Sequence, residues 1–178
     1  MKAVIALLIC GLGVVYPACD PGWTQFKENC IWFSNTQKIW TDAELDCRKH
    51  NAWLMTDDNE DKHNFISDIL YVFKSFHFNH FFIGGNDVAF ENQWRWLETG
   101  IHVGPFSKWG AGEPDGNNSK NCLSLKWQDD RNLVWSDETC GHISTRPTSG
   151  NKSHVHGAEN YICEKLVSNG GSMVVGRR

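Results

Sequence analysis

Residues 113–140 read EPDGNNSKNCLSLKWQDDRNLVWSDETC. The beginning of this stretch belongs to a longer segment, residues 104–121. That segment is dense in Gly, Pro, Asn and Ser, a composition typical of loops. Two short apolar runs follow, at 123–127 and 133–135, and they predict two strands. Glu113 and Asp115 lie in the loop, and Asp137 follows the second run. The stretch therefore predicts a long loop and a strand that both carry carboxylates.

Two helices are expected before this stretch. Thr41 fits a helix N-cap, because Glu44 three residues later would complete a capping box, and this helix would end near His50. Asp57 and Asp58 are expected to open the second helix. Its apolar residues recur at three-to-four spacing, which is typical of core packing: Phe65, Ile66, Ile69, Leu70 and Phe73.

The other apolar segments are short and strand-like. They comprise an aromatic hairpin at 23–33, a buried-strand candidate at 81–85, alternating residues at 94–97 and a last strand at 161–164. Residues 141–160 are expected to form a second polar loop. Helices followed by short strands around a long loop indicate the α+β class.

Composition narrows the class of function. The chain has 178 residues, enough for one domain, and its 17 Lys and Arg against 21 Asp and Glu leave a net charge of −4. This mild acidity argues against nucleic acid or an anionic membrane as partner. Seven cysteines and nine tryptophans disfavour a cytosolic enzyme. The sequence contains no nucleophile elbow and no phosphate loop, so we expect a protein that is not an enzyme.

The N-terminus predicts the compartment. Lys2 precedes an apolar run from residue 3 to residue 15, and Ala18 offers a cleavage site, as in a secretory signal peptide. The run is shorter than the roughly 20 residues of a spanning helix, so we expect a secreted, extracellular protein without a membrane span. The expected division is a signal peptide at 1–18, one domain at 19–165 and a flexible tail at 166–178.

Six cysteines remain once Cys10 leaves with the signal peptide, and an even number in an oxidising compartment implies disulfides. They are Cys19, Cys30, Cys47, Cys122, Cys140 and Cys163. Six cysteines allow 15 pairings, and the arithmetic alone does not choose among them. No Cys-x-x-Cys pair is present, which argues against a redox motif or a zinc finger.

From about residue 19 to residue 165 the chain resembles a C-type lectin domain. The signatures, in order, are Trp40 with Ala43 to Cys47, Phe82-Ile83-Gly84-Gly85, Trp94-x-Trp96, Phe106-x-x-Trp109, Glu113-Pro114-Asp115, Cys122, Trp135-Ser136-Asp137-x-x-Cys140 and Tyr161-Ile162-Cys163. One such tripeptide would be weak evidence, whereas the ordered set is specific. The resemblance implies a C-type lectin-like fold of two helices packed on short antiparallel sheets with a long ligand loop. It also implies the pairs Cys19–Cys30, Cys47–Cys163 and Cys122–Cys140.

The resemblance further implies a calcium-dependent carbohydrate site. Calcium takes six to eight oxygen ligands, and a cis Glu113–Pro114 bond would turn the carboxylates of Glu113 and Asp115 toward one point. In the family the ion also accepts two vicinal sugar hydroxyls, so Ca²⁺ is the expected cofactor and a glycan the expected partner. The candidate calcium ligands are Glu113, Asp115, Ser136 and Asp137, and the candidate sugar contacts are these four with Lys120 and Asn121. Without the family positions, three scattered acids would be interpreted as a solvated loop face.

Several residues depart from the family pattern. The mannose-type motif is Glu-Pro-Asn and the galactose-type motif Gln-Pro-Asp, so Glu113-Pro114-Asp115 is a hybrid. Ser136 replaces the asparagine of Trp-Asn-Asp. Lys120 stands where a glutamate is usual, and it would either enter the cage and lower the calcium affinity or contact an anionic ligand. No aromatic residue lies in 116–119, which favours a mannose-type or broad sugar preference.

A second calcium site of the family would use Asp87 and Glu91, which lie at matching spacing. Its later partners are absent, because Gly116 and Asn121 stand where acids are usual. A structural salt bridge or a solvated turn is therefore the favoured interpretation of Asp87 and Glu91.

Asn117 and Asn151 begin N-glycosylation sequons, and a glycan on Asn117 would stand beside the site, unless the sequon is unused. The 141–160 segment carries His142, His154 and His156. His154-x-His156 would place two imidazoles on one strand face for Zn²⁺, but we favour a loop with solvated histidines.

Two functions remain open. The first is a secreted, calcium-dependent lectin, with recognition of microbial glycans in innate immunity as a setting. The second is the same fold binding protein or mineral without calcium or sugar, which Lys120, Ser136 and the missing glutamate favour. Single lectin sites bind weakly, so a homo-oligomer is expected to raise avidity.

Overall fold

The computed structural model describes residues 18–74, 80–144 and 154–168. The expected signal segment up to residue 17, Asn151 and the tail beyond residue 168 lie outside this part of the chain. The described helices are α1 (Trp40–Lys49) and α2 (Glu60–Phe73). The strands are β1 (Thr24–Phe26), β2 (Asn29–Phe33), β3 (Trp53–Leu54), β4 (His80–Asn86), β5 (Arg95–Trp96), β6 (Cys122–Trp127), β7 (Leu133–Glu138), β8 (His142–Ser144), β9 (His154–His156) and β10 (Asn160–Leu166).

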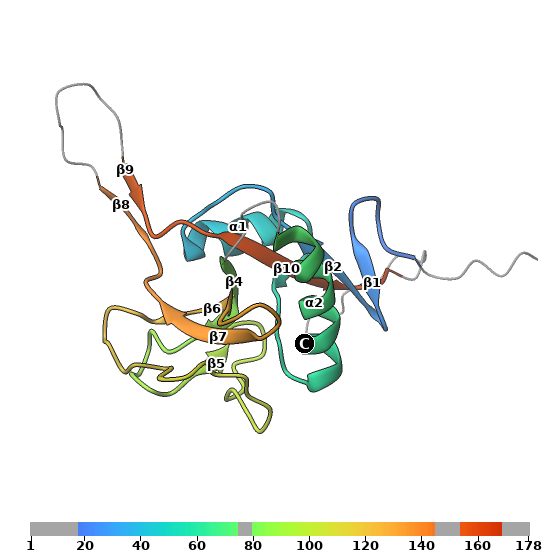
Figure 1. Ribbon diagram of the computed structural model, residues 1–178. Coiled ribbons are helices and arrows are strands. Elements are labelled where there is room, and N and C mark those ends of the chain that lie inside the picture. Colours follow the sequence, from blue (N-terminus) through green and yellow to red (C-terminus); the bar gives the residue numbers. More distant parts are fainter. Residues whose placement is uncertain (1–17, 75–79, 145–153, 169–178) are drawn as a thin grey trace, which may run out of the picture.

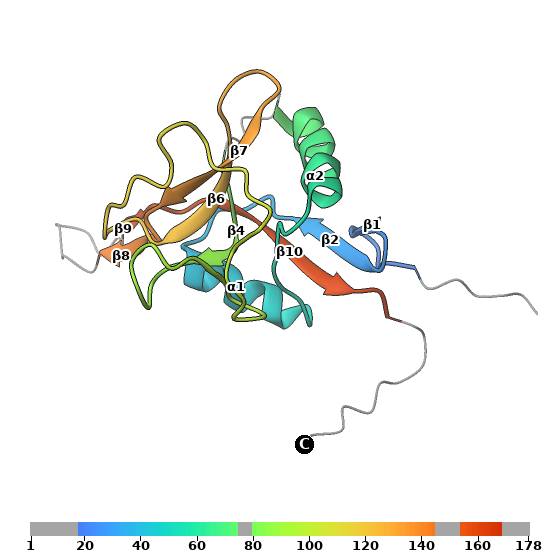
Figure 2. The same ribbon diagram turned by 90° about the horizontal axis from the view of Figure 1, so that it is seen from below.

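The main sheet has the strand order β1-β2-β10-β4-β6-β7, with β3 added to β10 and β5 to β4. It is a mixed sheet, because β10 pairs in parallel with β4 while β2, β3, β6 and β7 form antiparallel pairs. Strands β2 and β10 run between the two helices, and the long loop before β6 lies at the end of the molecule opposite β1 (Figures 1 and 2). The predicted α+β class is confirmed.

The disulfide bonds expected from the family resemblance are confirmed. Cys47 on α1 bonds Cys163 on β10, Cys122 at the start of β6 bonds Cys140 after β7, and Cys19 bonds Cys30. The Cys47–Cys163 bond spans 116 positions, so by chain entropy it stabilises the fold by roughly 4–5 kcal/mol.

The predicted capping box of α1 is wrong. The helix begins at Trp40 after Ile39, which makes no side-chain cap bond. Trp40 is the first residue of the helix, and its indole Nε1 donates to the Ile83 carbonyl at 2.9 Å. Glu44 instead bonds to β3, because its Oε2 accepts a hydrogen bond from the Leu54 amide at 2.8 Å.

The second helix also begins later than predicted. Its cap is Asn59, whose side chain accepts from the Lys62 amide at 2.9 Å. Asp57 is buried and contacts other partners, because its Oδ2 accepts from Trp135 Nε1 at 2.7 Å and lies 2.7 Å from His63 Nδ1. The Trp135 ring also packs edge-on against three aromatic rings, Trp96, Phe106 and Trp109. These contacts hold β7 in place directly before Ser136 and Asp137.

Two strands replace part of the expected polar loop at 141–160. β8 and β9 pair antiparallel at its two ends, and β10 starts at Asn160 and runs to Leu166, longer than predicted. The loop prediction fails for β8 and β9 because their apolar residues are too few to give a strand pattern in the sequence.

Acid stability is expected to depend on Tyr161. Hydrogen bonding from the buried Tyr161 hydroxyl, assisted by Lys38 and Lys49 and opposed by burial, lowers the pKa of Asp46 from 3.8 to about 2. Because the folded state has the lower pKa, this stabilisation is complete above about pH 4 and is lost as the pH falls toward 2. Tyr161→Phe should reduce the free energy of unfolding by about 1–2 kcal/mol at pH 7.

Urea unfolding of both proteins at pH 7, 4, 3 and 2 measures this, and the difference should shrink below pH 4. Tyr71→Phe is the control, because it keeps the ring that packs on Trp127. A Tyr161→Phe difference that stays constant down to pH 2 would contradict the assignment.

Candidate functional site

The loop that precedes β6 is fastened to β7 by its backbone. The Trp135 amide donates to the Lys108 carbonyl at 2.8 Å, and the Gly110 amide donates to the Trp135 carbonyl at 2.9 Å. The Glu113 amide then donates to the Gly110 carbonyl at 3.0 Å, and the Glu113–Pro114 peptide is cis. Glu113 is thereby placed against the strand residues that follow Trp135.

Glu113, Ser136 and Asp137 form one cluster. The Ser136 hydroxyl donates to Glu113 Oε1 at 3.1 Å. The Asp115 amide donates to Asp137 Oδ2 at 3.0 Å, so the loop backbone is tied to the strand carboxylate. Asp137 and Ser136 are buried, and Glu113 is half-buried. Of the four candidate calcium ligands, these three lie together.

Two carboxylate oxygens in this cluster are buried and have no hydrogen-bond partner among the described residues: Glu113 Oε2 and Asp137 Oδ1. Burial, followed by the interaction with Glu113, raises the pKa of Asp137 to about 7. Burial acts to raise the pKa of Glu113, but the interactions with Asp137 and Lys126 outweigh it and hold that pKa below its usual value. Two ionised carboxylates in such a place need either a shared proton or a cation between them.

Two lysines neutralise the acids. Lys126 Nζ lies 2.6 Å from Glu113 Oε1, and Lys120 Nζ lies 2.6 Å from Asp115 Oδ2. The Asp115 side chain is thus turned to Lys120, and that interaction lowers the Asp115 pKa and raises the Lys120 pKa. In this arrangement the described part of the chain holds no group of three His, Cys, Asp or Glu side chains ready to bind a metal.

Lys126 is a residue of the site that the sequence did not predict. It lies on β6, two residues beyond Ser124, and Ser124 is the cross-strand partner of Ser136. Lys126 is therefore a diagonal neighbour of Ser136 on one face of the strand pair. The strand alternation in 122–127 could have found it, but only with the β6–β7 register in hand.

Asp87 and Glu91, the residues of the second predicted calcium site, lie near the same loop. Asp87 is buried; its Oδ2 accepts from the Asn92 amide at 2.8 Å, and its Oδ1 has no partner among the described residues. The pKa of Glu91 is raised, first by burial and then by Asp87 and Asp115. No described ion pair involves Asp87, and the described residues place no third acid here in a group that could hold a metal. The bond from the Asn92 amide shows that Asp87 closes a turn.

In the rest of the loop, asparagine side chains form hydrogen bonds with nearby loop residues. Asn117 Oδ1 accepts from the Ser119 amide and hydroxyl at 3.1 and 2.8 Å, so this exposed sequon forms a tight turn. The Asn121 Nδ2 donates to the Asn118 carbonyl at 3.3 Å, and its Oδ1 is buried without a partner in the described ranges. A hollow of about 680 Å³ adjoins this turn, and its lining includes Trp40, Val88, Leu97, Asn118 and Asn121.

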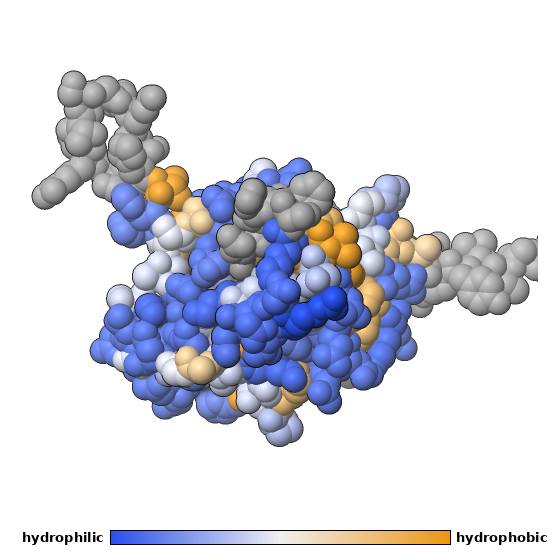
Figure 3. Space-filling model, viewed as in Figure 1, coloured by the Kyte–Doolittle hydropathy of each residue, from blue (hydrophilic) through white to orange (hydrophobic). Residues whose placement is uncertain are grey.

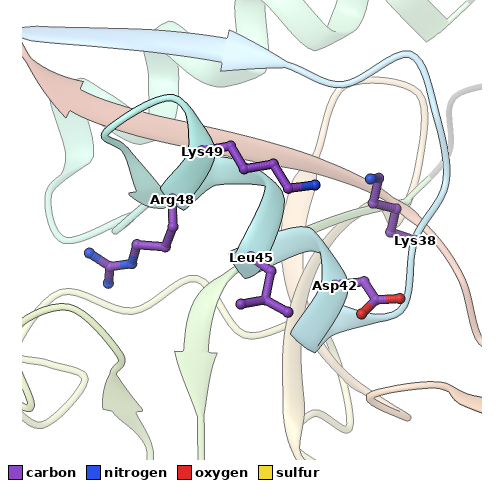
Figure 4. Close-up of a pocket in the computed structure, with 5 residues that line it drawn as sticks. All are labelled: Lys38, Asp42, Leu45, Arg48 and Lys49. Atoms are coloured by element: carbon purple, nitrogen blue, oxygen red, sulfur yellow. The ribbon is translucent and has the colours of Figure 1, made fainter.

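The outer surface of α1 carries a separate hollow of about 640 Å³ (Figure 4). It is lined by Lys38, Asp42, Leu45, Arg48 and Lys49. The cations have acidic partners: Lys38 and Lys49 contact Asp46, and Arg48 contacts Glu44 and Glu98. Because these charges are already compensated, we interpret this surface as solvated ion pairs and not as an anion site.

Comparison with known proteins supplies the family context. The sequence profile described as Lectin C-type domain matches residues 36–145. Human C-type lectin domain family 4 member D is 30% identical over 138 residues, and a perlucin-like protein of Mytilus galloprovincialis is 29% identical over 132 residues. The carbohydrate-recognition domain of mouse scavenger receptor C-type lectin superimposes with a TM-score of 0.65 at 25% identity, covering 85% of this chain and 100% of that domain.

The alignments differ in how much of each relative they cover. They include 75% of this chain and 60% of the human protein, against 70% of this chain and 81% of the mussel protein. Among the described residues no helix has the length and apolar character needed to cross a membrane.

Proposed function

Because this chain belongs to the C-type lectin domain family, we propose that it is a secreted, calcium-dependent lectin that binds glycans of mannose type or of broad preference. The family supports carbohydrate binding as the general activity, and its domains are generally non-enzymatic binding modules. Calcium dependence, secretion, glycosylation and a role in innate immunity are parts of the proposal.

One observation carries the calcium site. Glu113 Oε2 and Asp137 Oδ1 are buried, and neither has a hydrogen-bond donor within the described ranges. Calcium is a hard cation that binds oxygen, and carboxylate oxygens of this kind suit it. Glu113, Asp115, Ser136 and Asp137 would hold the ion, and the bound ion would offer coordination positions to vicinal sugar hydroxyls.

The protein side chains around these acids would orient the sugar. Ser136 can donate a hydrogen bond, whereas an ionised Asp115 can only accept, so the site has fewer amide donors than the mannose-type pattern. Lys120 Nζ lies against Asp115 Oδ2 and must leave it if that oxygen is to bind the cation. Lys126 Nζ lies against Glu113 Oε1 and leaves Glu113 Oε2 open to the ion. Sugar recognition is therefore proposed to depend on calcium displacing the Lys120 ammonium group from Asp115.

Calorimetry tests the proposal directly. EDTA-stripped protein is titrated with calcium alone, with mannose and with galactose, and each sugar is then titrated with and without calcium. We expect calcium binding to tighten in the presence of one sugar, and that sugar to bind more tightly with calcium by the same factor, because coupling is reciprocal. Calcium binding that is not coupled to either sugar, or a titration that shows no heat of calcium binding, would overturn the proposal.

Lys120→Glu is expected to raise calcium affinity by about tenfold, because it removes a competing cation 2.6 Å from Asp115 and adds a carboxylate. Lys108→Glu is the matched control on the same loop, since Lys108 pairs only distantly, at 3.8 Å, with Glu60. Calcium titration of the two variants checks this. Equal gains in both would show a general charge effect and not a local one.

The second candidate is a module of the same fold that binds protein or mineral without calcium or sugar. The observation that favours it is that Lys120 and Lys126 already neutralise the loop acids. Binding of a ligand that is unaffected by EDTA, together with no calcium heat, would select this candidate.

A further inference from the structure

The β8–β9 ribbon carries a second group of candidate ligands, away from the loop acids. His142 lies opposite His156, Ile143 opposite Val155 and Ser144 opposite His154. The ribbon stands out from the main sheet (Figure 1). The sequence favoured solvated histidines in an irregular loop here, and the strand pairing gives them a defined arrangement instead.

Two imidazoles meet across this ribbon. The ring centroids of His142 and His156 are 5.0 Å apart, and the ring planes are inclined by only 20°. Because side chains alternate along a strand, Ile143 and Val155 lie on the face of the ribbon opposite the histidines. They are 47% and 52% exposed, and Figure 3 shows apolar surface at this ribbon. His154 lies two residues before His156, at a position on the same face as His156.

The base of the ribbon is held firmly. Gly141 and Gly157 flank the two strands with φ of 78° and 67°, a region that favours glycine. A Cβ on Gly141 would lie 2.7 Å from the Gly157 carbonyl oxygen, so the two backbones touch. The Cys122–Cys140 bond lies directly before Gly141. This anchoring fixes the distance between the strands and lowers the entropic penalty of bringing the two rings onto one ligand.

We propose that His142 and His156 bind a zinc ion across the β8–β9 ribbon. Imidazole nitrogen is a preferred zinc ligand at about 2.0–2.1 Å. Ring centroids 5.0 Å apart are close enough for both rings to reach one ion once each side chain has rotated to turn a nitrogen toward it. Calcium prefers oxygen, so this site is chemically distinct from the loop acids and does not depend on the proposed lectin function.

Zinc titration of tag-free protein tests the proposal. The titration is run at pH 7.5 with excess calcium present, so that the loop acids do not compete for zinc. We expect one zinc ion per chain, with His142→Gln and His156→Gln each weakening the affinity by about tenfold or more. His102→Gln is the matched control, because His102 is an exposed histidine that contacts Arg95 in another part of the fold.

The outcomes separate clearly. Loss of zinc binding in the two ribbon variants, with retention in His102→Gln, supports the site. His154→Gln then distinguishes two supported forms: retained affinity indicates a two-ring chelate completed by water, and lost affinity indicates three rings. Zinc binding that is absent in the parent, or equally strong in His142→Gln and His156→Gln, overturns the proposal.

Discussion

Asp137→Asn is expected to weaken calcium binding by roughly 100-fold, or about 3 kcal/mol, and to remove calcium-dependent glycan binding. Asp137 supplies a buried oxygen without a partner among the described residues, and its other oxygen accepts from the Asp115 amide. Asparagine keeps the shape and an acceptor for that amide, but it removes the negative charge that attracts the ion. The fold should therefore survive while the site fails.

Calcium calorimetry and glycan binding are measured together with thermal unfolding. Asp130→Asn is the matched control, because Asp130 is a 91% exposed carboxylate that pairs with Lys74. Glu113→Gln is expected to behave like Asp137→Asn, since Glu113 provides the facing oxygen. Calcium affinity that is unchanged in both site variants would refute the assignment of these carboxylates.

Glu164→Gln is expected to lower the free energy of unfolding by about 3–5 kcal/mol, because it leaves the ammonium of Lys62 buried without its main counter-charge. Lys62 and Glu164 are 4% and 2% exposed, and Lys62 Nζ lies 2.9 Å from Glu164 Oε1. The other Glu164 oxygen accepts from the amide and hydroxyl of Thr56. The pair therefore ties α2, β10 and the segment after β3 together.

Chemical unfolding at pH 7 measures the loss. The double variant Lys62→Met/Glu164→Leu should recover only part of it: apolar residues need no counter-charge, but the Thr56 amide and hydroxyl lose their acceptor. Asp61→Asn, which breaks the exposed Lys27–Asp61 pair, is the control and should leave stability unchanged within error. A Glu164→Gln protein as stable as this control would show that the buried pair is not required.

Much of the fold was predictable because its signals are local. The apolar stripe of 65–73 is confirmed as part of α2, with Ile66 and Leu70 buried. The strands at 81–85, 123–127 and 133–135 are confirmed within β4, β6 and β7. The predicted helix starts are wrong where a side chain forms a hydrogen bond with a residue distant in the sequence. Glu44 bonds Leu54 and Asp57 bonds Trp135, so neither is available as the local helix signal that its type suggested.

The acids and Lys120 of the candidate site were predictable from the sequence, and Lys126 was not. Glu113, Ser136 and Asp137 stand at family positions, and the structure brings them together. Asp115 is adjacent in sequence, but its side chain pairs with Lys120. Lys126 reaches Glu113 only through the register of β6 with β7, which no short window of sequence contains.

The sequence by itself determined the family, the class of fold and which oxygen-bearing residues are candidates for the site. These properties depend on residue type, spacing and order, which are all present in the chain before it folds. Only the tertiary structure decided which side chains face each other: Lys126 with Glu113, Lys62 with Glu164, and His142 with His156. The physical reason is that strand register and burial create these contacts between segments 13 to 102 positions apart, where local sequence preferences have no influence.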